Sequence, residues 1–369
     1  MATKMSSSSS LIMTSKTIKS FKCASTFQEG KTLSMFNSLD FHHSGTVFAV
    51  GGSSSSTISI YDALNPRLLT RLKSQVTGTK HVRFSHSKDA VFFVGSNEKP
   101  DASKEVEDNC IHYASLHTNQ FVRHFKGHDS RITCVSRLHA MNNTFLSCDE
   151  NGTMKLWDLR GKEPKGQLTV NSVKKNSRAK LIAANDVTGF IFAVAESTGM
   201  LRLYDSKEPG RGAFLEKDLA PLLRRECGPD TCIEAIYMSS KDNESGDIII
   251  STNKEPLISL NPVTLNFQCL LEGRRRTTPN FLPASISPDG NFFVAASEQK
   301  IPLPSSYSED GGGAVYSMLV WSLKKPDAKV QTYWHGTSLT PPRAMQWNPR
   351  YAEFASACCA VKLYIPRAS

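Results

Sequence analysis

The sequence predicts an all-β fold in which seven four-stranded sheets, or blades, form a closed ring. Three observations lead to this prediction. Short runs of alternating apolar residues recur along the chain, separated by turns rich in Gly, Asn, Asp and Ser, as is typical of antiparallel strands. Seven of these runs share a similar ending, an aromatic or apolar residue followed by a turn. One strand-like run near the start belongs to no repeat, and a ring of sheets needs such a strand to close it.

The best-preserved repeat shows what kind of blade this is. FKGH at Phe125 to His128 is followed by FLSCDENGTMKLWDLR at Phe145 to Arg160, so that Gly-His precedes Trp-Asp by about thirty residues. This spacing is typical of one blade of a WD40-type β-propeller. A four-stranded blade cannot bury both of its faces alone, and it therefore stacks on neighbours of the same length.

The seven endings predict the third strand of each blade. They are TISIYD at 57–62, IHYASLH at 111–117, MKLWD at 154–158, LRLYD at 201–205, LISLN at 257–261, MLVWS at 318–322 and VKLYI at 361–365. Further strand-like runs precede them, at 46–52, 90–96, 190–196, 247–252, 291–297 and 353–359. The usual blade length would favour eight blades. The excess length falls in polar segments at 97–109, 171–180, 208–230 and 299–313, which we expect to be loops, so seven is the better count. No window shows helical spacing at useful length.

The two ends of the chain predict how the ring closes. The last repeat supplies three strands and then stops, whereas the run from Thr17 to Phe27 has no repeat of its own. Pairing the two would remove two free sheet edges. We therefore expect residues 1–16 to be a disordered Ser-rich tail and residues 17–369 to be a single WD40 β-propeller. The tail overlaps a transit peptide in composition, but it lacks Arg, and disorder is the better interpretation.

Composition favours a soluble intracellular protein and argues against an enzyme. Hydrophobic residues make up 39% of the 369 residues, and no apolar run reaches membrane-spanning length. The nine Cys include no C-x-x-C pair, which predicts buried, reduced thiols. GxSxG, HExxH and GxGxxG motifs are absent. His81 and His86 have no carboxylate or Cys at metal-ligand spacing. We therefore expect no catalytic residues, no cofactor and no bound metal.

Two groups of polar residues stand out in this sequence. His128, Ser147, Asn151 and Trp157 are expected to form the buried polar network of the best-preserved blade, because an unpaired buried polar group costs about 1 to 3 kcal/mol. The net charge of +10 points to polyanionic partners. The candidates for phosphopeptide binding are Lys174, Lys175, Arg178, Arg274, Arg275 and Arg276, since Arg and Lys bind phosphate groups well. Nucleic acid or solvent alone remain alternatives, although no aromatic residues are interleaved to stack bases.

Several phrases of the sequence resemble one WD-repeat family closely. They are IHYASLHTNQFVRHFKGH at 111–128, NTFLSCDENGTMKLWDLR at 143–160, LRLYDSKEPGRGAF at 201–214, DIIISTN at 247–253 and WNPRYAEFASACCAVKLYIP at 347–366. On these phrases the chain resembles the WD repeat-containing protein 82 family from about Ile18 to Pro366. In one departure, Asn151 stands at the turn position where Asp is usual, so we expect a weaker buried network in that blade.

The resemblance implies a function without catalysis. Members of this family are nuclear subunits shared by COMPASS-type histone methyltransferase complexes and by a type 1 protein phosphatase complex linked to transcription termination. It implies a rigid, monomeric adaptor in a hetero-complex, which docks on a protein scaffold subunit and links it to transcribing RNA polymerase II, with the phosphorylated polymerase tail as a further partner. Location in the nucleus and no membrane partner are expected, and direct binding of nucleic acid stays open. The alternative is an RNA-processing or ribosome-biogenesis WD40 scaffold protein.

Overall fold

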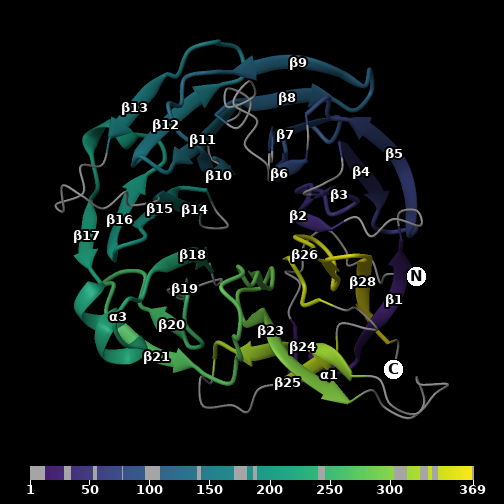
Figure 1. Cartoon of the computed structure of the whole chain (residues 1–369), viewed down its shortest axis with the longest axis vertical. Helices are drawn as coiled ribbons and strands as arrows, with labels where there is room; N and C mark the ends of the chain where they lie inside the picture. The colour runs from purple at the N-terminus through teal and green to yellow at the C-terminus, as the bar shows by residue number, and fades with distance from the viewer. Residues whose placement is uncertain are drawn as a thin grey trace.

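The fold is a ring of seven blades, seen end-on in Figure 1. The computed structural model describes residues 13–28, 35–52, 56–76, 78–95, 109–138, 143–169, 181–185, 189–239, 246–302, 314–324, 331–334 and 340–367. Within these ranges, every strand belongs to one of seven four-stranded antiparallel sheets. The predicted seven-bladed β-propeller is therefore confirmed.

Four consecutive strands form each of the first six blades. Blade one contains β2 (Phe36–Phe41), β3 (Val47–Gly52), β4 (Thr57–Asp62) and β5 (Arg67–Lys73); blade two contains β6 (Thr79–Phe84), β7 (Ala90–Gly95), β8 (Ile111–Ser115) and β9 (Gln120–Phe125); blade three contains β10 (Ile132–Arg137), β11 (Thr144–Asp149), β12 (Thr153–Asp158) and β13 (Gly166–Thr169). Blade four contains β14 (Leu181–Asn185), β15 (Ile191–Glu196), β16 (Met200–Asp205) and β17 (Leu215–Asp218); blade five contains β18 (Ile233–Met238), β19 (Ile248–Thr252), β20 (Leu257–Leu260) and β21 (Phe267–Leu271); blade six contains β22 (Ala284–Ile286), β23 (Phe292–Pro302), β24 (Ala314–Ser322) and β25 (Gln331–Trp334).

Blade seven joins the two ends of the chain. It contains β26 (Ala344–Trp347), β27 (Phe354–Ala357), β28 (Val361–Pro366) and, as its outer strand, β1 (Phe21–Phe27). Strand β1 pairs with β28 in antiparallel register, and the purple strand lies beside the yellow one in Figure 1. The expected closure by the N-terminal strand is confirmed: β28 is paired on both sides, and β1 forms the outer edge of this sheet.

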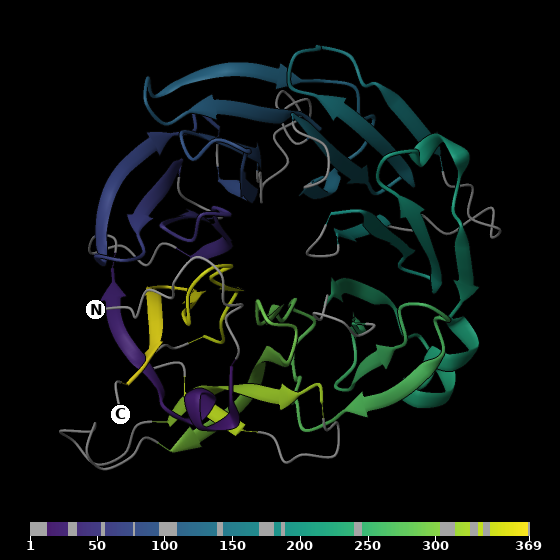
Figure 2. The same ribbon diagram turned by 180° about the vertical axis from the view of Figure 1, so that it is seen from behind.

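The expected start of the ordered chain is corrected by a short helix. Residues Ser15–Lys19 form α1, which Thr14 caps by accepting a hydrogen bond from the Thr17 backbone N–H. Met13 and Ile18 are buried among apolar side chains of blades six and seven. Figure 2 shows this purple helix in front of those two blades. The tail boundary at residue 16 is therefore too late, because an apolar residue that covers the blades already stands at position 13; residues 1–12 lie outside the described part of the chain.

A second correction concerns the segment 208–230, which is not a simple loop. It contains the short 3-10 helix η1 (Pro209–Arg211), strand β17 and the helix α3 (Ala220–Cys227). Leu223 of α3 is buried in the apolar cluster shared by blades four and five. The absence of helix expected from the sequence was wrong here, because eight residues are too few to show a clear helical period. The expected loops at 97–109 and 171–180 fall almost wholly outside the described residues.

Neighbouring blades are held together by apolar packing and by hydrogen bonds between their inner strands. Each apolar cluster draws side chains from two adjacent blades, as where Phe92 and Phe145 lie 4.5 Å apart. Polar side chains of β2 accept backbone N–H groups of the next blade: Ser38 from Val82, and Asp40 from Phe84, each at 2.8 Å. No helix among the described residues is long and apolar enough to cross a membrane. The ring is thus a continuous, well-connected platform.

Candidate interaction surface

The buried network of blade three is formed by side chains from a loop and two strands. His128 Nε2 lies 2.6 Å from the Ser147 hydroxyl, and the Trp157 indole N–H donates to the same hydroxyl at 2.7 Å. His128 Nδ1 lies 2.8 Å from the Asp149 carboxylate. Trp157 is fully buried, and so its indole N–H needs this acceptor. The four side chains connect the start of the blade to its third strand, which is a structural role.

Asn151 is not part of this network, so the presence of Asn at this position does not remove a carboxylate from it. The carboxylate that completes it belongs to Asp149, the last residue of β11. Asn151 lies beyond, in the turn, where its backbone N–H donates to Asp149 Oδ1 at 3.0 Å. The physical reason is strand alternation: Ser147 and Asp149 are two residues apart in one strand, so both side chains point to the face where His128 lies.

The arginine run at 274–276 is mostly a structural element. The Arg274 side chain is buried and donates to the backbone carbonyls of Glu255 and Lys254, at 2.9 and 2.6 Å. Burial and the neighbouring charge of Arg276 lower the pKa of Arg274 to about 10, so it remains a cation at neutral pH. Both terminal nitrogens of Arg276 donate hydrogen bonds to the Glu234 carboxylate, at 2.6 and 2.9 Å. Both guanidinium groups are thus already engaged within the chain.

Only Arg275 of the three presents its side chain to solvent. Its backbone N–H donates to the Ser297 hydroxyl at 3.0 Å, and this hydrogen bond holds the backbone of Arg275 in place. The interpretation of all three arginines as a phosphopeptide site is therefore corrected to one residue, because the charges of the other two are compensated internally. The remaining candidates, Lys174, Lys175 and Arg178, lie outside the described residues.

Blade four carries a pocket that was not expected from the sequence. Its volume is about 410 Å³, and it lies between the turn before β15 and the segment that joins β16 to β17. Phe190 and Phe214, which are 52% and 57% exposed, form apolar walls. Connections between first and second strands and between third and fourth strands lie at the same end of an antiparallel blade, and this is why two distant segments meet here.

Charged side chains of both signs surround this apolar surface. Lys207 lies over the Phe190 ring, 5.2 Å from its centroid, and Arg211 pairs with Glu208 at 2.7 Å. Both members of that pair are largely exposed, so the pair contributes little to stability. Two exposed phenylalanines within one polar rim are the pattern expected where a partner's apolar side chain docks. The sequence signal was partial: Phe214 stands in a segment expected to be a loop, whereas Phe190 was counted in the strand-like run 190–196 and lies just before β15.

One further group of side chains could hold a metal ion among the residues that the structure describes. It consists of Cys110, His112 and His124 in blade two. It lies on a different blade from both the blade-three network and the blade-four pocket. The His81 and His86 side chains do not belong to it.

Comparisons with known proteins agree with the fold. The family model described as "WD domain, G-beta repeat" matches residues 21–62 and 119–158. WD repeat-containing protein 82 of Drosophila melanogaster is 26% identical over 95% of this chain and 95% of its own length. The COMPASS component SWD2 of Saccharomyces cerevisiae is 27% identical over 94% of this chain and 95% of its own length. The crystal structure of the Myceliophteria thermophila Cps50 (Swd1) β-propeller domain superposes with a TM-score of 0.66 at 11% identity, and it covers 94% of this chain and 99% of that one.

Proposed function

The chain belongs to the WD repeat-containing protein 82 family, and on that premise we propose that it is a non-catalytic scaffold subunit of a chromatin-associated complex. The observation that carries this proposal is the extent of the similarity, which covers 95% of both this chain and WD repeat-containing protein 82. One of the similar proteins is named as a component of COMPASS.

The protein acts in the nucleus, within a COMPASS-type histone lysine methyltransferase complex, a type 1 phosphatase complex of transcription termination, or both. It links such a complex to transcribing RNA polymerase II. Arg275, which is exposed, is the proposed contact for the phosphorylated polymerase tail together with Lys174, Lys175 and Arg178, because basic side chains bind phosphate groups.

The blade-four pocket is the proposed contact for the scaffold subunit. Its two exposed phenylalanines offer an apolar surface that is large enough for one aliphatic or aromatic side chain. Aromatic side chains that become buried when two proteins bind carry a large share of the binding energy in protein interfaces. The charged rim formed by Lys207 and Arg211 with Glu208 would then orient the partner.

An affinity purification tests this function directly. The tagged full-length chain should recover a scaffold protein together with a histone methyltransferase or a type 1 phosphatase. The double variant Phe190→Ala/Phe214→Ala should lose that scaffold. Phe281→Ala is the matched control, because Phe281 is similarly exposed at 45% and lies between β21 and β22, at the opposite end of the antiparallel strands. Recovery of neither complex would contradict the proposed function, whereas equal recovery by the double variant would contradict only the assigned pocket.

A second measurement distinguishes the proposed function from the alternative, an RNA-processing scaffold. If ultraviolet crosslinking in cells links the protein to RNA, and no polymerase or phosphatase partner is recovered with it, the alternative is favoured. Charge reversal of Arg275 should weaken binding of a phosphorylated peptide in a salt-dependent way, because exposed phosphate contacts are screened. Arg211→Glu is a control of equal charge change at the pocket rim, and it should leave phosphopeptide binding unaltered.

A further inference from the structure

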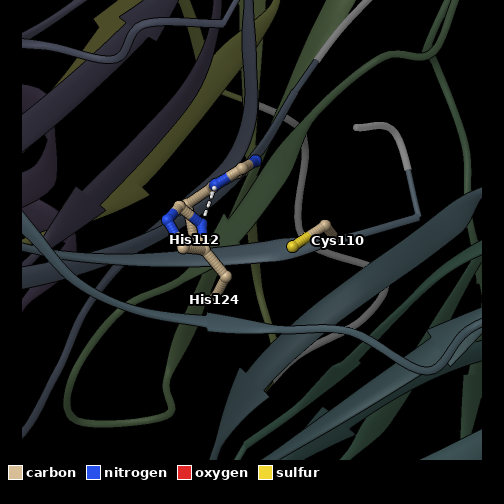
Figure 3. A group of neighbouring side chains, drawn as sticks. All are labelled: Cys110, His112 and His124. Atoms are coloured by element: carbon tan, nitrogen blue, oxygen red, sulfur yellow. Dashed lines mark hydrogen bonds between the residues drawn. The ribbon is translucent and has the colours of Figure 1, made fainter. Parts of the chain in front are cut away.

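Three potential metal ligands meet on the outer hairpin of blade two. Cys110 directly precedes β8, His112 lies within β8, and His124 lies on the adjacent strand β9. One ligand atom from each, a sulfur and two ring nitrogens, lies within 4.8 Å of the others. In Figure 3 the sulfur of Cys110 points toward the two imidazole rings. The structure thus gathers three soft or borderline ligands at one point of the outer hairpin.

Strand geometry explains why these residues meet. Cys110 and His112 are two residues apart, so their side chains point to the same face of the sheet. His112 and His124 are direct cross-strand partners in the antiparallel β8–β9 pair, and directly opposite side chains lie close together. The register shift between Tyr113 and Ala114 falls after the pair of histidines and leaves it intact. Backbone pairing therefore fixes the two histidines, and Cys110 lies directly before the paired strand.

The distances between the ligand atoms suit a tetrahedral ion of zinc size. The Nδ1 atoms of His112 and His124 lie 2.9 Å apart. Two nitrogens bound to one Zn²⁺ at about 2.0 to 2.1 Å in tetrahedral geometry lie about 3.3 Å apart, so a small rotation of either ring would admit the ion. A similar adjustment of the Cys110 side chain would bring its sulfur to the usual Zn–S bond length of about 2.3 Å from the ion.

The surroundings of the cluster are apolar on one side and open on the other. Cys110 and His112 are buried, with exposed fractions of 3% and 5%, whereas His124 is exposed. Phe93 and Phe121 pack against the His112 ring at 5.2 and 5.5 Å. Rings held in this way keep their orientation, and the exposed side at His124 gives an ion and a water molecule access. Three protein ligands with one open position describe a known type of zinc site.

The two ring nitrogens of His112 differ in their surroundings. Its Nδ1 atom faces Nδ1 of His124, whereas its Nε2 atom is buried and has no hydrogen-bond partner among the described residues. An imidazole binds one ion through one ring nitrogen, so Nδ1 is the ligand atom of His112 and Nε2 stays outside the coordination. Lys126 contributes positive charge near both imidazoles. Cys binds metal ions as the thiolate and not as the thiol, so the sulfur of Cys110 would offset one charge of the ion.

We propose that Cys110, His112 and His124 bind one Zn²⁺ ion, with water as the fourth ligand, and that the ion fastens β8 to β9 at the outer edge of blade two. Two imidazoles and a thiolate are ligands that prefer zinc to magnesium or calcium. Binding releases the thiol proton of Cys110 to solvent. Because β9 is the outermost strand of its blade, the ion would stabilise an edge that only one strand supports.

The test uses tag-free, full-length protein that has been treated with a chelator and kept reduced. Titration with Co²⁺, a spectroscopic substitute for zinc, should give visible absorption of a tetrahedral site and a thiolate-to-metal charge-transfer band. Both should saturate at one ion per chain and disappear when Zn²⁺ displaces Co²⁺. Excess Zn²⁺ should also raise the thermal midpoint of the metal-free protein, because the ion binds only the folded state. Absence of stoichiometric binding would overturn the proposal.

Variants assign the ligands. Cys110→Ser should abolish the charge-transfer band, and His124→Gln should weaken Co²⁺ binding roughly tenfold or more. His124 is exposed, so its replacement leaves the core intact and keeps the test valid if Cys110→Ser fails to fold. The controls are His117→Gln, in the exposed turn of the same hairpin, and Cys232→Ser, an exposed thiol of blade five. Binding that survives His124→Gln unchanged, or that is lost equally in the controls, would refute this site.

Discussion

Replacing Glu353 with Gln should make the protein less sensitive to alkaline pH. Glu353 is fully buried in blade seven and accepts a hydrogen bond from Asn348 Nδ2 at 2.7 Å. The same Nδ2 group donates to the Gly45 carbonyl of blade one at 2.8 Å, so the carboxyl lies where the ring closes. Burial raises the pKa of Glu353 to about 8, against the hydrogen bond from Asn348, which lowers it.

The sign of the effect follows from where the proton is held. Below about pH 4.5 the carboxyl is protonated in both the folded and the unfolded chain, and burial carries no charge penalty. Between about pH 4.5 and the folded-state pKa of about 8, the unfolded chain releases the proton while the folded chain keeps it. Each pH unit in this window lowers the free energy of unfolding by up to about 1.4 kcal/mol. The full loss approaches about 5 kcal/mol by pH 8, which is large beside a typical total stability of about 5 to 15 kcal/mol.

Urea unfolding, followed by tryptophan fluorescence from about pH 5 to about pH 9, measures this difference. Gln carries no charge and can still accept from Asn348, so Glu353→Gln should gain stability over the original chain as the pH rises. Glu298→Gln is the matched control of opposite sign. Hydrogen bonds from Thr278 and Thr277 outweigh burial and lower the pKa of Glu298, so its contribution should be lost as the pH falls. Parallel pH profiles for the original chain and Glu353→Gln would refute the reasoning.

Three further predictions concern stability. Trp157→Ala should lower the free energy of unfolding by about 3 to 5 kcal/mol, because it opens a core cavity and removes a buried hydrogen bond; unchanged stability in denaturant would show that the indole is not structural. Arg276→Ala should cost about 2 to 3 kcal/mol through the loss of charged hydrogen bonds, whereas Arg275→Ala should leave the thermal midpoint unchanged, and equal effects would contradict the distinction between them. Deleting residues 1–11 should leave thermal unfolding unchanged, but deleting residues 1–27 should abolish soluble expression by exposing an edge of blade seven; tolerance of both deletions would contradict closure by the first strand.

The repeat pattern predicted the seven blades, but it did not predict which side chains contact one another. Each blade could be predicted because the alternation of apolar and polar residues in a strand is visible within a few consecutive residues. The place of Asp149 was missed, although alternation along β11 puts it on the same face as Ser147, because the turn residue Asn151 was given the role instead. The helix α3 was missed because its eight residues are shorter than a reliable helical period.

The arginine run illustrates what local sequence could not decide. A run of basic residues looks the same whether it is solvated or compensated. Arg276 is engaged because Glu234, forty-two positions away, lies beside it, and Arg274 is engaged by backbone carbonyls about twenty positions away. Only the path of the chain through blade five brings these groups together. The cluster of Cys110, His112 and His124 was overlooked for the same reason, since it depends on the register of β8 against β9.

The sequence by itself determined the all-β class, the number of blades and the closure of the ring, because strand periodicity and turn residues act over short stretches of chain. Tertiary structure decided which polar side chains meet, which charges remain exposed and where a pocket opens on blade four. These properties depend on residues far apart in the chain, and a buried charge or hydroxyl finds its partner only after the blades have stacked.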